Sequence, residues 1–533
     1  MKVLTAAEMA ATDRRTVQAG IVSATLMENA GCAVARFALR QYPQAQSILV
    51  VCGKGNNGGD GSVAARLLAA AGKSVTVLLL AEASALQGDA AAMFAALNAT
   101  PVEIVCATDE ASLAATGLFD CCDLVIDAMF GTGFKPPLRG LAITVRDRLA
   151  ACSASVVAVD LPSGWDADAT EEKNVEAFRA DTVVTFTAPK PAHLFGNLTG
   201  STSKPVVVAE IGSPETDVIS ETQLFWAGSA KAVAEKPREV NSNKGRFGHV
   251  LVVGGALGKA GAPAMASLAS LRTGAGLVTA GVPESIVSAV AAVTPELMTI
   301  PLDERKHTGT VGGTLSRRNM SRERMITLLD RKTVVALGPG LSTEPDAAMF
   351  ARVLVEKTRM PLVLDADGLN AFAGQTQLLN GRERVLVLTP HPGEMARLLG
   401  LTVQAVEADR VNIARAFAMK HHVILVLKGW RTLIAHPSGR VAVNTSGNPA
   451  MAKGGSGDIL TGIVAAMLAQ YPERAAEAVE AAVYLHGLAA DFAARAQDEH
   501  TVLATDTVAH LSDAFRYRMK DEDGFTWICG LRT

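Results

Sequence analysis

Short runs of apolar residues, many of them β-branched, recur along the entire chain and constrain its fold more than any other feature. Each run ends at a glycine or a polar turn, and a stretch with helical spacing often follows. Uninterrupted apolar runs are typical of strands buried on both faces, as in parallel sheets covered by helices. The runs are residues 47–52, 74–80, 124–128, 155–161, 250–253, 277–281, 333–337, 362–365, 385–389 and 423–427. The pattern predicts an α/β architecture in both halves.

A polar stretch rich in turn-forming residues, Ser213–Arg246, separates the two halves of the chain. After it, GHVLVVGG starts a new strand and glycine loop, as SILVVCGKG does earlier in the sequence. We therefore predict a first domain over residues 1–225 and a second over residues 226–533. Residues 303–324 are strongly polar, and we expect them to form a surface excursion.

The composition excludes several classes of function. With 50 Lys and Arg against 53 Asp and Glu among 533 residues, bulk charge does not favour binding to nucleic acid or an anionic membrane. The apolar run 459–469 is far shorter than the roughly 20 residues of a membrane-spanning helix, and acidic residues interrupt the first fifteen positions, where an export signal is apolar. Seven cysteines without a CxxC pair favour neither zinc nor disulfides. We expect a cytoplasmic enzyme.

The first glycine loop, residues 53–61, follows the predicted strand 47–52 and precedes a helical stretch and a second strand. Its glycines satisfy GxGxxG, and Glu82 has the spacing of a ribose-binding acid, so the loop is compatible with dinucleotide binding. Two asparagines and an aspartate exceed what a plain pyrophosphate turn needs. A glycine turn with polar caps explains the glycines but not this density of polar groups. Asn57 supplies a carbonyl oxygen of the kind that hard cations prefer.

Two further strands of the first domain end in acidic residues followed by glycines. Asp127 precedes Gly131-Thr132-Gly133, and Asp160 precedes Ser163 and a glycine. In open parallel sheets the carboxyl ends of the strands gather at the edge where ligands bind. A single aspartate there often only caps a helix, but three such strand ends indicate a binding site.

The motifs GNNGGDG, IDAMFGTG and VDLPSG follow in this order after VLTAAEMAATDRR and LMENAG. They make the first domain resemble, from end to end, the YjeF N-terminal family of NAD(P)H-hydrate epimerases. The resemblance implies a Rossmann-like three-layer sandwich, a catalytic acid/base at Asp160, and potassium bound by Asn57, Asp127 and Ser163. It implies that the hydrated nucleotide is bound by Asn56, Asn57, Gly58, Gly59, Asp60, Gly131, Thr132, Gly133, Phe134, Lys135, Pro136, Pro137 and Asp160.

Epimerisation at C6 of a hydrated nicotinamide requires proton transfer and a pocket that stabilises a ring-opened or iminium-like cation. Asp160, at a strand end, is placed for both tasks, and Lys135 is a candidate to assist it.

The second glycine loop, residues 454–457, leads into a helix whose apolar face includes Ile459 and Ile463. Backbone N–H groups at such a helix start form an anion site suited to a phosphoryl group. Asp458 is placed to accept a proton from an attacking hydroxyl, although an acid in a first turn is also favourable by itself. The four-residue loop GGSG around it favours the catalytic interpretation.

Other strand ends in the second domain carry matching chemistry. They include residues 338–340, 365–370, 389–394 and 428–429. Each segment alone is an ordinary turn. Together they supply hydrogen-bond donors that bind phosphate, a base, and oxygen ligands for Mg²⁺.

The motifs GHVLVVGG, GKAGAP, GPGL, DADGLN, TPHPGE and GGSGDILTG make residues 245–490 resemble the ribokinase-like superfamily, specifically the YjeF C-terminal family of NAD(P)H-hydrate dehydratases. The resemblance implies a ribokinase-like three-layer sandwich, ADP as co-substrate, and Mg²⁺. It implies contacts with the hydrated nucleotide at Ala262, Gly340, His391 and Asp458. It implies contacts with ADP at Lys428, Gly429, Trp430, Arg431, Thr432 and Gly457.

These resemblances lead to one hypothesis: a bifunctional enzyme that epimerises R- and S-NADHX and NADPHX, and dehydrates the S form with ADP as phosphoryl donor. Asp458 would deprotonate the C6 hydroxyl, which takes the β-phosphoryl of ADP, and expulsion of phosphate restores the reduced nucleotide. Two alternatives are a small-molecule kinase with a regulatory first domain and a non-catalytic nucleotide-binding module. The HPGE motif argues against the first, and Asp160 against the second. We also expect a homo-oligomer.

Overall fold

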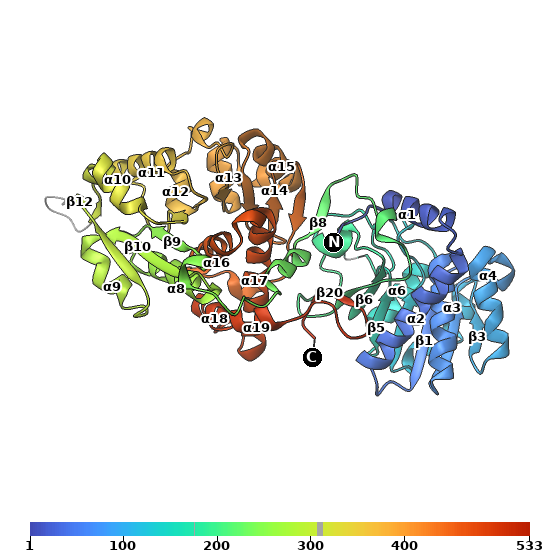
Figure 1. Cartoon of the computed structure of the whole chain (residues 1–533). Helices are drawn as coiled ribbons and strands as arrows, with labels where there is room; N and C mark the ends of the chain where they lie inside the picture. The colour runs from blue at the N-terminus through green and yellow to red at the C-terminus, as the bar shows by residue number, and fades with distance from the viewer. Residues whose placement is uncertain (175, 306–312, 533) are drawn as a thin grey trace. The chain divides into compact units, whose positions relative to one another are not determined.

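The computed structural model describes residues 1–174, 176–305 and 313–532, which form two compact units. Unit 1 comprises Met1–Leu224 and the segment that starts at Arg518, and unit 2 comprises Phe225–Tyr517 (Figure 1). The division after Leu224 lies next to the predicted boundary. The predicted extent of the second domain to residue 533 requires a correction, because the segment from Arg518 packs into unit 1.

Unit 1 contains an eight-stranded sheet in the order β20-β7-β6-β5-β4-β1-β2-β3. All neighbouring pairs are parallel except β20 with β7. The strands are β1 (Ser47–Cys52), β2 (Ser74–Leu79), β3 (Glu103–Cys106), β4 (Leu124–Ala128), β5 (Ser155–Val159), β6 (Thr182–Phe186), β7 (Val206–Ala209) and β20 (Thr526–Cys529). The strands predicted at residues 47–52, 74–80, 124–128 and 155–161 are confirmed as β1, β2, β4 and β5.

Helices cover both faces of this sheet and make it the middle of three layers. The helices are α1 (Ala6–Gln18), α2 (Ser23–Gln41), α3 (Asn56–Ala70), α4 (Gly88–Ala95), α5 (Glu110–Ala114), α6 (Leu141–Ala151) and α7 (Pro191–Phe195). Apolar side chains of α2, α3 and α4 share one core with the sheet, and those of α5 and α6 share a second core on the opposite face (Figure 1). The predicted three-layer α/β sandwich is therefore confirmed.

Strand β20 closes the edge of the unit 1 sheet with residues that lie more than three hundred positions from β7 in sequence. The Trp527 side chain is 3% exposed, and its ring centroid lies 6.1 Å from that of Phe37 on α2. Its Nε1 donates a hydrogen bond to Asp521 Oδ2 at 2.9 Å, and Asp521 also pairs with Arg40. The C-terminal segment is therefore part of the unit 1 core.

Replacing Trp527 with alanine is expected to lower the free energy of unfolding of unit 1 by about 3–5 kcal/mol, since it removes a buried aromatic side chain. The urea unfolding of unit 1, followed by far-ultraviolet circular dichroism, measures this change. Ile219→Ala is the control, because Ile219 is 46% exposed and its truncation is expected to cost less than about 0.5 kcal/mol. Equal stability of Trp527→Ala and wild type would mean that β20 is dispensable.

Unit 2 contains a ten-stranded sheet in the order β11-β10-β9-β14-β15-β16-β17-β18-β19-β8. The strands are β8 (Leu224–Trp226), β9 (His249–Val253), β10 (Leu277–Pro283), β11 (Met298–Leu302), β14 (Val334–Leu337), β15 (Leu362–Leu364), β16 (Leu386–Leu388), β17 (Ile424–Leu427), β18 (Leu433–Ala435) and β19 (Val441–Val443). Strands β9 to β11 and β14 to β17 pair in parallel, whereas β17-β18 and β18-β19 are antiparallel. Each strand predicted in the second half is confirmed.

Helices again form the outer layers. They are α8 (Gly261–Thr273), α9 (Val287–Ala291), α10 (Arg322–Leu329), α11 (Pro345–Lys357), α12 (Ala366–Asn370), α13 (Pro392–Leu399), α14 (Val403–Ala408), α15 (Arg410–His421), α16 (Ser456–Gln470), α17 (Ala475–Ala496), α18 (Ala504–Ala509) and α19 (Leu511–Arg516). Figure 1 shows α10 to α15 on one side of the sheet and α8, α16 and α17 on the other. Unit 2 is therefore a second three-layer sandwich.

The polar excursion predicted over residues 303–324 contains residues 306–312, which lie outside the described residues. Two short strands on either side of them, β12 (Glu304–Arg305) and β13 (Thr314–Leu315), pair in an antiparallel manner.

In both units the strand order reverses beside a glycine that directly follows a strand, Cys52-Gly53 in unit 1 and Val253-Gly254 in unit 2. In unit 1 the chain moves from β1 to β2 and β3, and then returns to place β4 on the other side of β1. Gly53 and the loop after β4 approach so closely that a Cβ at Gly53 would lie 2.2 Å from Met129 O. Unit 2 repeats this arrangement, because a Cβ at Gly254 would lie 2.2 Å from Pro339 O. Ligands of open α/β sheets bind at such switch points.

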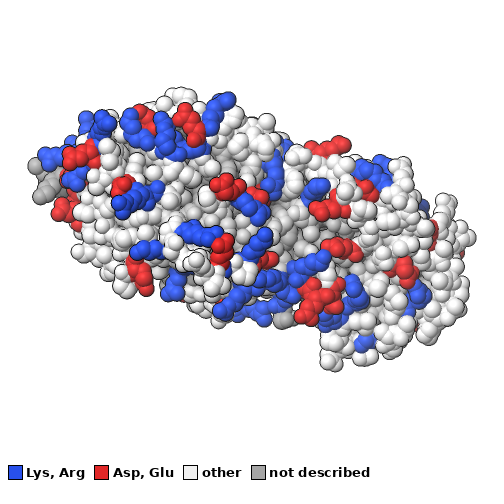
Figure 2. Space-filling view, in the orientation of Figure 1, with Lys and Arg blue, Asp and Glu red and all other residues white. Residues whose placement is uncertain are grey.

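On the face drawn in Figure 2, Lys and Arg side chains are interspersed with Asp and Glu, as the net charge of −3 leads us to expect. Within the described part of the chain, no helix combines the length and the hydropathy that a membrane span requires.

Candidate active sites

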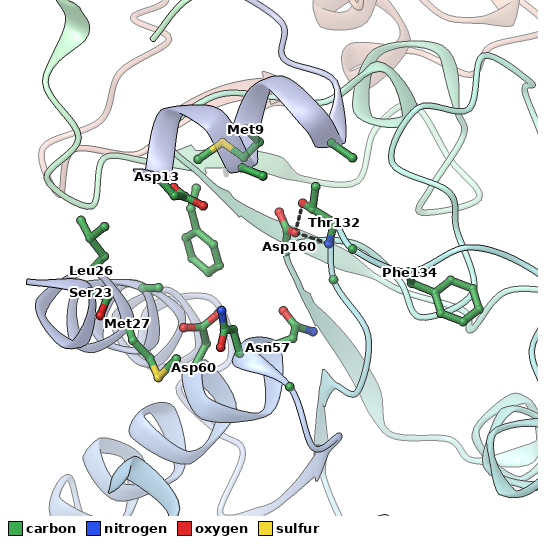
Figure 3. Close-up of a pocket in the computed structure, with 18 of the residues that line it drawn as sticks. Met9, Asp13, Ser23, Leu26, Met27, Asn57, Asp60, Thr132, Phe134 and Asp160 are labelled. Carbon is green, nitrogen blue, oxygen red and sulfur yellow. Dashed lines mark hydrogen bonds between the residues drawn. The ribbon is translucent and has the colours of Figure 1, made fainter. Parts of the chain in front are cut away.

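The first cavity lies at the carboxyl ends of β1, β4 and β5 in unit 1 and has a volume of about 960 Å³. Helix α1 and the start of α2 form its opposite wall (Figure 3). Most of the residues predicted to bind the hydrated nucleotide line this cavity, namely Asn56, Asn57, Asp60, Gly131, Thr132, Gly133, Phe134, Lys135 and Asp160.

Four predicted binding residues lie behind or beside this cavity. A Cβ at Gly58 would lie 1.9 Å from Gly53 O, and a Cβ at Gly59 would lie 2.5 Å from Met27 Sδ, so both glycines allow close packing of α3. Pro136 lines a neighbouring depression of about 420 Å³, and Pro137 follows it in the chain. These four positions shape the loops around the cavity rather than its wall.

Asp160, directly after β5, is the most densely bonded acid of the first cavity. Its Oδ2 accepts hydrogen bonds from the backbone N–H of Thr132, at 2.8 Å, and from the Thr132 hydroxyl. Its Oδ1 accepts from Thr185 Oγ1 and Lys190 Nζ, both at 2.8 Å. Although burial opposes ionisation, Lys190 and these hydrogen bonds hold the pKa of Asp160 well below its ordinary value. Asp160 is therefore a carboxylate at neutral pH.

Lys190 is a site residue that the sequence analysis missed. Its side chain is only 2% exposed, and its Nζ donates to Asp160, to Thr185 and to the Phe186 carbonyl. It follows β6, a strand that the apolar pattern did not reveal. The strand TVVTF with APK directly behind it repeats the strand-end pattern used elsewhere, and this was the available signal.

His193 fixes the backbone of Asp160, which has a positive φ of 66°. The backbone N–H of Lys190 donates to His193 Nδ1 at 2.9 Å, so the ring proton lies on Nε2, which donates to Asp160 O at 2.7 Å. Burial lowers the pKa of His193 to about 4, so this neutral tautomer persists at neutral pH. The left-handed conformation is thus held by a specific contact.

Two more carboxyl groups face the first cavity, Asp13 from α1 and Asp60 from α3 (Figure 3). Burial, reinforced by the charge of Asp160, raises the pKa of Asp60 well above its ordinary value, and burial also raises the pKa of Asp13. One lysine-paired carboxylate and two acids with raised pKa values therefore share one pocket. Such divergence of neighbouring carboxyl groups is typical of sites that transfer protons.

The predicted potassium ligands contain a buried acid in contact with a serine. Asp127 is fully buried, and its two carboxylate oxygens accept hydrogen bonds from Ser163 Oγ at 2.6 Å and Ser163 N at 2.7 Å. Burial raises the pKa of Asp127 to about 6. Asn57 lies against Gly131, where a Cβ would be 2.9 Å from Asn57 Oδ1, and its buried Nδ2 has no hydrogen-bond partner among the described residues. A buried acid and an amide without a partner are compatible with a cation at this place.

The second cavity, in unit 2, has a volume of about 690 Å³. All the residues predicted to contact ADP line it, namely Lys428, Gly429, Trp430, Arg431, Thr432 and Gly457, and so does His391. Ala262 and Gly340 lie outside its lining but against each other, since a Cβ at Gly340 would be 3.2 Å from Ala262 Cβ. The residues predicted to contact ADP therefore line one cavity, whereas Ala262 and Gly340 contact each other outside its lining.

Asp365, at the end of β15, organises the charged part of the second site. Its Oδ1 accepts hydrogen bonds from Lys428 Nζ at 2.9 Å and Thr389 Oγ1 at 2.7 Å, and its Oδ2 accepts from Thr461 Oγ1 at 2.8 Å. Lys428 Nζ also lies 3.7 Å from Glu394 Oε2. Burial acts to lower the pKa of Lys428, but the charges of Asp365 and Glu394 outweigh it and raise this pKa. A fixed positive charge therefore stands at the cavity.

Asp458 lies in the first turn of α16, next to this lysine. A Cβ at Gly457 would lie 3.4 Å from Lys428 Nζ, so the helix start and the lysine are direct neighbours. Burial, together with the charge of Asp365, raises the pKa of Asp458 to about 6. Asp458 therefore has the proton affinity of a general base that works near neutral pH. Backbone N–H groups at the helix start supply donors for a phosphoryl group.

His391 caps α13 and presents one ring edge to the second cavity. Its Nδ1 accepts hydrogen bonds from the backbone N–H groups of Gly393 and Glu394, at 3.0 and 3.4 Å, while Glu394 Oε2 accepts from His391 N at 2.8 Å. Burial lowers the pKa of His391. The neutral ring therefore carries its proton on Nε2, where it can donate to a ligand.

The sequence analysis missed the wall of the second cavity opposite the glycine loop. This wall contains Asn444, Ser446, Gly447, Asn448, Val483, His486 and Gly487. The polar cluster NTSGNP after β19 was the signal for the loop, but no local pattern identifies the residues of α17.

Comparison with known proteins assigns each of the two units to a protein family. The family model described as YjeF-related protein N-terminus matches residues 23–192, and the model described as NAD(P)H-hydrate dehydratase matches residues 250–513. The chain is 40% identical over 528 residues to the bifunctional NAD(P)H-hydrate repair enzyme Nnr of Moorella thermoacetica, covering 97% of each chain. The chain belongs to this family of bifunctional NAD(P)H-hydrate repair enzymes. The Nnr of Escherichia coli K12 is 33% identical over 509 residues, which cover 95% of this chain and 92% of that protein.

Solved structures similar to this member of the repair-enzyme family cover unit 2. An ADP/ATP-dependent NAD(P)H-hydrate dehydratase from Bacillus subtilis, co-crystallised with ATP/Mg²⁺, is 29% identical and has a TM-score of 0.45, covering 56% of this chain and 99% of its own. A ribokinase-like superfamily protein from Enterococcus faecalis is 27% identical, with a TM-score of 0.48 and coverage of 56% and 97%. The family assignment made from the sequence motifs is confirmed, and the two alternative interpretations lose support because the repair enzymes match both units together.

Proposed function

We propose that unit 1 interconverts the R and S epimers of NADHX and NADPHX, and that unit 2 dehydrates the S epimer to NADH or NADPH with ADP as phosphoryl donor. The observation that carries this proposal is that each unit has its own cavity with charged groups at it. Asp160 lines the first cavity, whereas Lys428 and Gly457 line the second, and Asp458 directly follows Gly457 in the chain. Membership in a family of bifunctional repair enzymes supports the pairing of the two activities.

In unit 1, Asp160 acts as a fixed negative charge, because its lowered pKa keeps the side chain ionised. Loss of the C6 hydroxyl as water leaves an iminium cation on the tetrahydropyridine ring, and an adjacent carboxylate stabilises that charge. Lys190 and Thr185 keep Asp160 ionised and oriented before substrate arrives. Burial raises the pKa of Asp60 and that of Asp13, so these two acids are the candidates to donate a proton to the departing oxygen.

In unit 2, Asp458 removes the proton of the C6 hydroxyl of the S epimer. The hydroxyl oxygen then bonds to the β-phosphorus of ADP as the bond to the bridging oxygen breaks, and AMP leaves. The ring-nitrogen lone pair expels inorganic phosphate from C6, and loss of one proton from the ring restores the reduced nucleotide. Lys428 and the N–H groups of the α16 start neutralise charge on the transferring phosphoryl group.

Mg²⁺ would supply further neutralisation of phosphate charge when bound in unit 2. Asp365 and Glu394 are the nearby carboxylates, but Lys428 already lies between them, 2.9 and 3.7 Å from their oxygens. We therefore propose that the ion is held mainly through the nucleotide phosphates, with Glu394 as its nearest protein ligand.

The decisive test follows the near-ultraviolet absorbance of the reduced nicotinamide in a mixture of both hydrate epimers with Mg²⁺, K⁺ and ADP, with ATP in a parallel sample. Full recovery of NADH with ADP is expected, because S-hydrate is replenished from the R form. Recovery that stops at the S fraction would contradict the epimerase assignment. No recovery with either nucleotide would contradict the dehydratase assignment.

We propose that potassium binds in unit 1 through oxygens of Asn57, Asp127 and Ser163. Bound potassium would compensate the buried charge of Asp127, whose pKa of about 6 reflects burial without a cationic neighbour among its described contacts. Asp127→Asn is expected to raise the K⁺ concentration for half-maximal epimerisation about 10–100-fold. Epimerase rates measured across a K⁺ titration at constant ionic strength check this, with dehydration of purified S-hydrate as the internal control. An unchanged K⁺ dependence would contradict the site.

We also propose a cytoplasmic location, supported by seven free thiols, several of them exposed or half-buried. The homo-oligomer stays a prediction, which light scattering of the full chain would check.

A further inference from the structure

The wall of the second cavity combines two kinds of surface. The first is charged and polar, made by Lys428 and the α16 start at Gly457. The second is largely apolar and belongs to α16, α17 and the loop after β19, with Leu460, Pro449 and Val483 as members. A nucleoside diphosphate has the same division, because its phosphates are anionic whereas its base is planar, uncharged and mostly apolar. The phosphates therefore fit the first surface and the adenosine moiety fits the second.

Helix α17 and the loop 444–448 form one rigid wall on the adenosine side. Ser446 Oγ donates to Tyr484 O at 2.8 Å, and Asp491 accepts from Gly447 N at 3.0 Å and Asn448 Nδ2 at 2.9 Å. A Cβ at Gly487 would lie 2.3 Å from Ser446 Oγ, so helix and loop are in direct contact. This wall is built before any nucleotide arrives.

The polar side chains Asn444, Ser446 and Asn448 of this wall form hydrogen bonds with neighbouring residues, whereas Nε2 of His486 forms none within the described part of the chain. The residue is 5% exposed and lines the cavity, yet its Nε2 has no hydrogen-bond partner among the described residues. Buried polar atoms in folded proteins are almost always paired, so an unpaired one beside a cavity indicates that a ligand completes it. Burial, with a smaller contribution from the Lys428 charge, lowers the pKa of His486 to about 4, so the ring is neutral at pH 7.

We propose that His486 recognises the adenosine moiety of the nucleotide co-substrate by a hydrogen bond from its neutral imidazole. A neutral imidazole carries one donor and one acceptor, which suits the edge of adenine or a ribose hydroxyl, whereas a phosphate would favour a cation. This inference rests on the proposed use of ADP in unit 2. It assigns to α17 a role in nucleotide selection that the motif residues Lys428–Thr432 and Gly457 do not include.

Calorimetric titration of ADP and of inorganic pyrophosphate into the full-length protein tests the proposal. His486→Phe keeps the ring shape and removes both nitrogens, so the Kd of ADP is expected to rise about two- to tenfold while that of pyrophosphate is unchanged. His486→Gln, which keeps an amide group near the position of Nε2, is expected to recover part of the affinity. An unchanged Kd of pyrophosphate shows that the cavity of unit 2 is folded in the variants.

Each other outcome overturns the inference and also identifies which of its assumptions is wrong. Equal ADP affinity of wild type and His486→Phe would mean that the ring makes no contact with the nucleotide. Equal losses for ADP and pyrophosphate would place His486 at the phosphates. If wild type itself does not bind ADP, the proposed dehydratase function fails as well. If His486→Phe does not fold, NMR of the ¹⁵N-labelled histidines in wild type decides, because the inference requires the His486 resonances to shift with ADP and not with pyrophosphate.

Discussion

Asp458→Asn is expected to reduce the rate of S-hydrate dehydration by about 10²–10⁴-fold, the usual contribution of a general base. The substitution keeps the shape and the first-turn position of the side chain but removes its ability to accept the hydroxyl proton. Epimerisation in unit 1 is expected to continue at the wild-type rate. Single-turnover formation of NADH from purified S-hydrate measures the first effect, and conversion between resolved epimers measures the second.

The pH dependence of dehydration provides an independent check of the same residue. Because the pKa of Asp458 is raised to about 6, its ionised form is lost as the pH falls through 6, and the dehydration rate is expected to fall with it. Asp458→Asn is expected to lack this acidic limb. Asp330→Asn is the matched control, since the Asp330 side chain is 69% exposed and its exchange is expected to leave both rate and pH profile unchanged. A wild-type profile that is flat through pH 6 would contradict the role of Asp458 as base.

Asp160→Asn is expected to reduce epimerisation by about 10²–10⁴-fold, with dehydration of purified S-hydrate unaffected. An amide cannot supply the negative charge that stabilises the cationic ring, although it still accepts hydrogen bonds from Thr132 and Lys190. In a mixture of epimers with ADP, recovery of NADH is then expected to stop when the S fraction is exhausted, apart from slow spontaneous epimerisation. The final absorbance of the reaction measures this directly.

A folding control is needed for this variant, because Asp160→Asn leaves the buried Lys190 without its counter-ion. Removing one partner of a buried pair costs about 3–5 kcal/mol, so part of unit 1 could unfold. Combining Asp160→Asn with Lys190→Met removes both charges and is expected to restore stability, measured by urea unfolding, without restoring epimerisation. If either Asp160→Asn or Asp458→Asn abolished both activities in a folded chain, the assignment of one reaction to each unit would be wrong.

The strands that the sequence predicted share a physical property with one another. β1, β4, β5 and β9 are buried on both faces, so their apolar runs are continuous and visible without any partner. β3 was missed because its residues Glu103–Cys106 are only partly buried and its apolar run is short. β18 and β19 were missed because their apolar runs, LIA and VAV, are only three residues long and polar residues bound them on both sides. β20 was missed because its pairing partner β7 lies more than three hundred positions earlier in the sequence.

The residues of the candidate sites likewise fall into those that the sequence identified and those that only the structure revealed. Asp127, Asp160 and Asp458 stand next to strands or glycine loops, and local sequence patterns therefore identified them as site residues. The role of Lys190, the raised pKa of Asp60 and the unpaired Nε2 of His486 depend on contacts between elements that are remote in sequence. Their roles became visible only when Asp160 and Lys190 were seen 2.8 Å apart and the surroundings of His486 were known.

The sequence by itself thus determined the two-unit α/β architecture, the family, and the acids expected to carry the chemistry. It could do so because burial periodicity and turn composition are local properties that each segment expresses independently. The tertiary structure alone decided which charge state each acid has, since a pKa depends on burial and on neighbours that the chain brings together from distant positions. It also decided that the C-terminal strand completes unit 1 and that α17 forms a wall of the nucleotide cavity, because pairing and packing are selected by the whole folded chain.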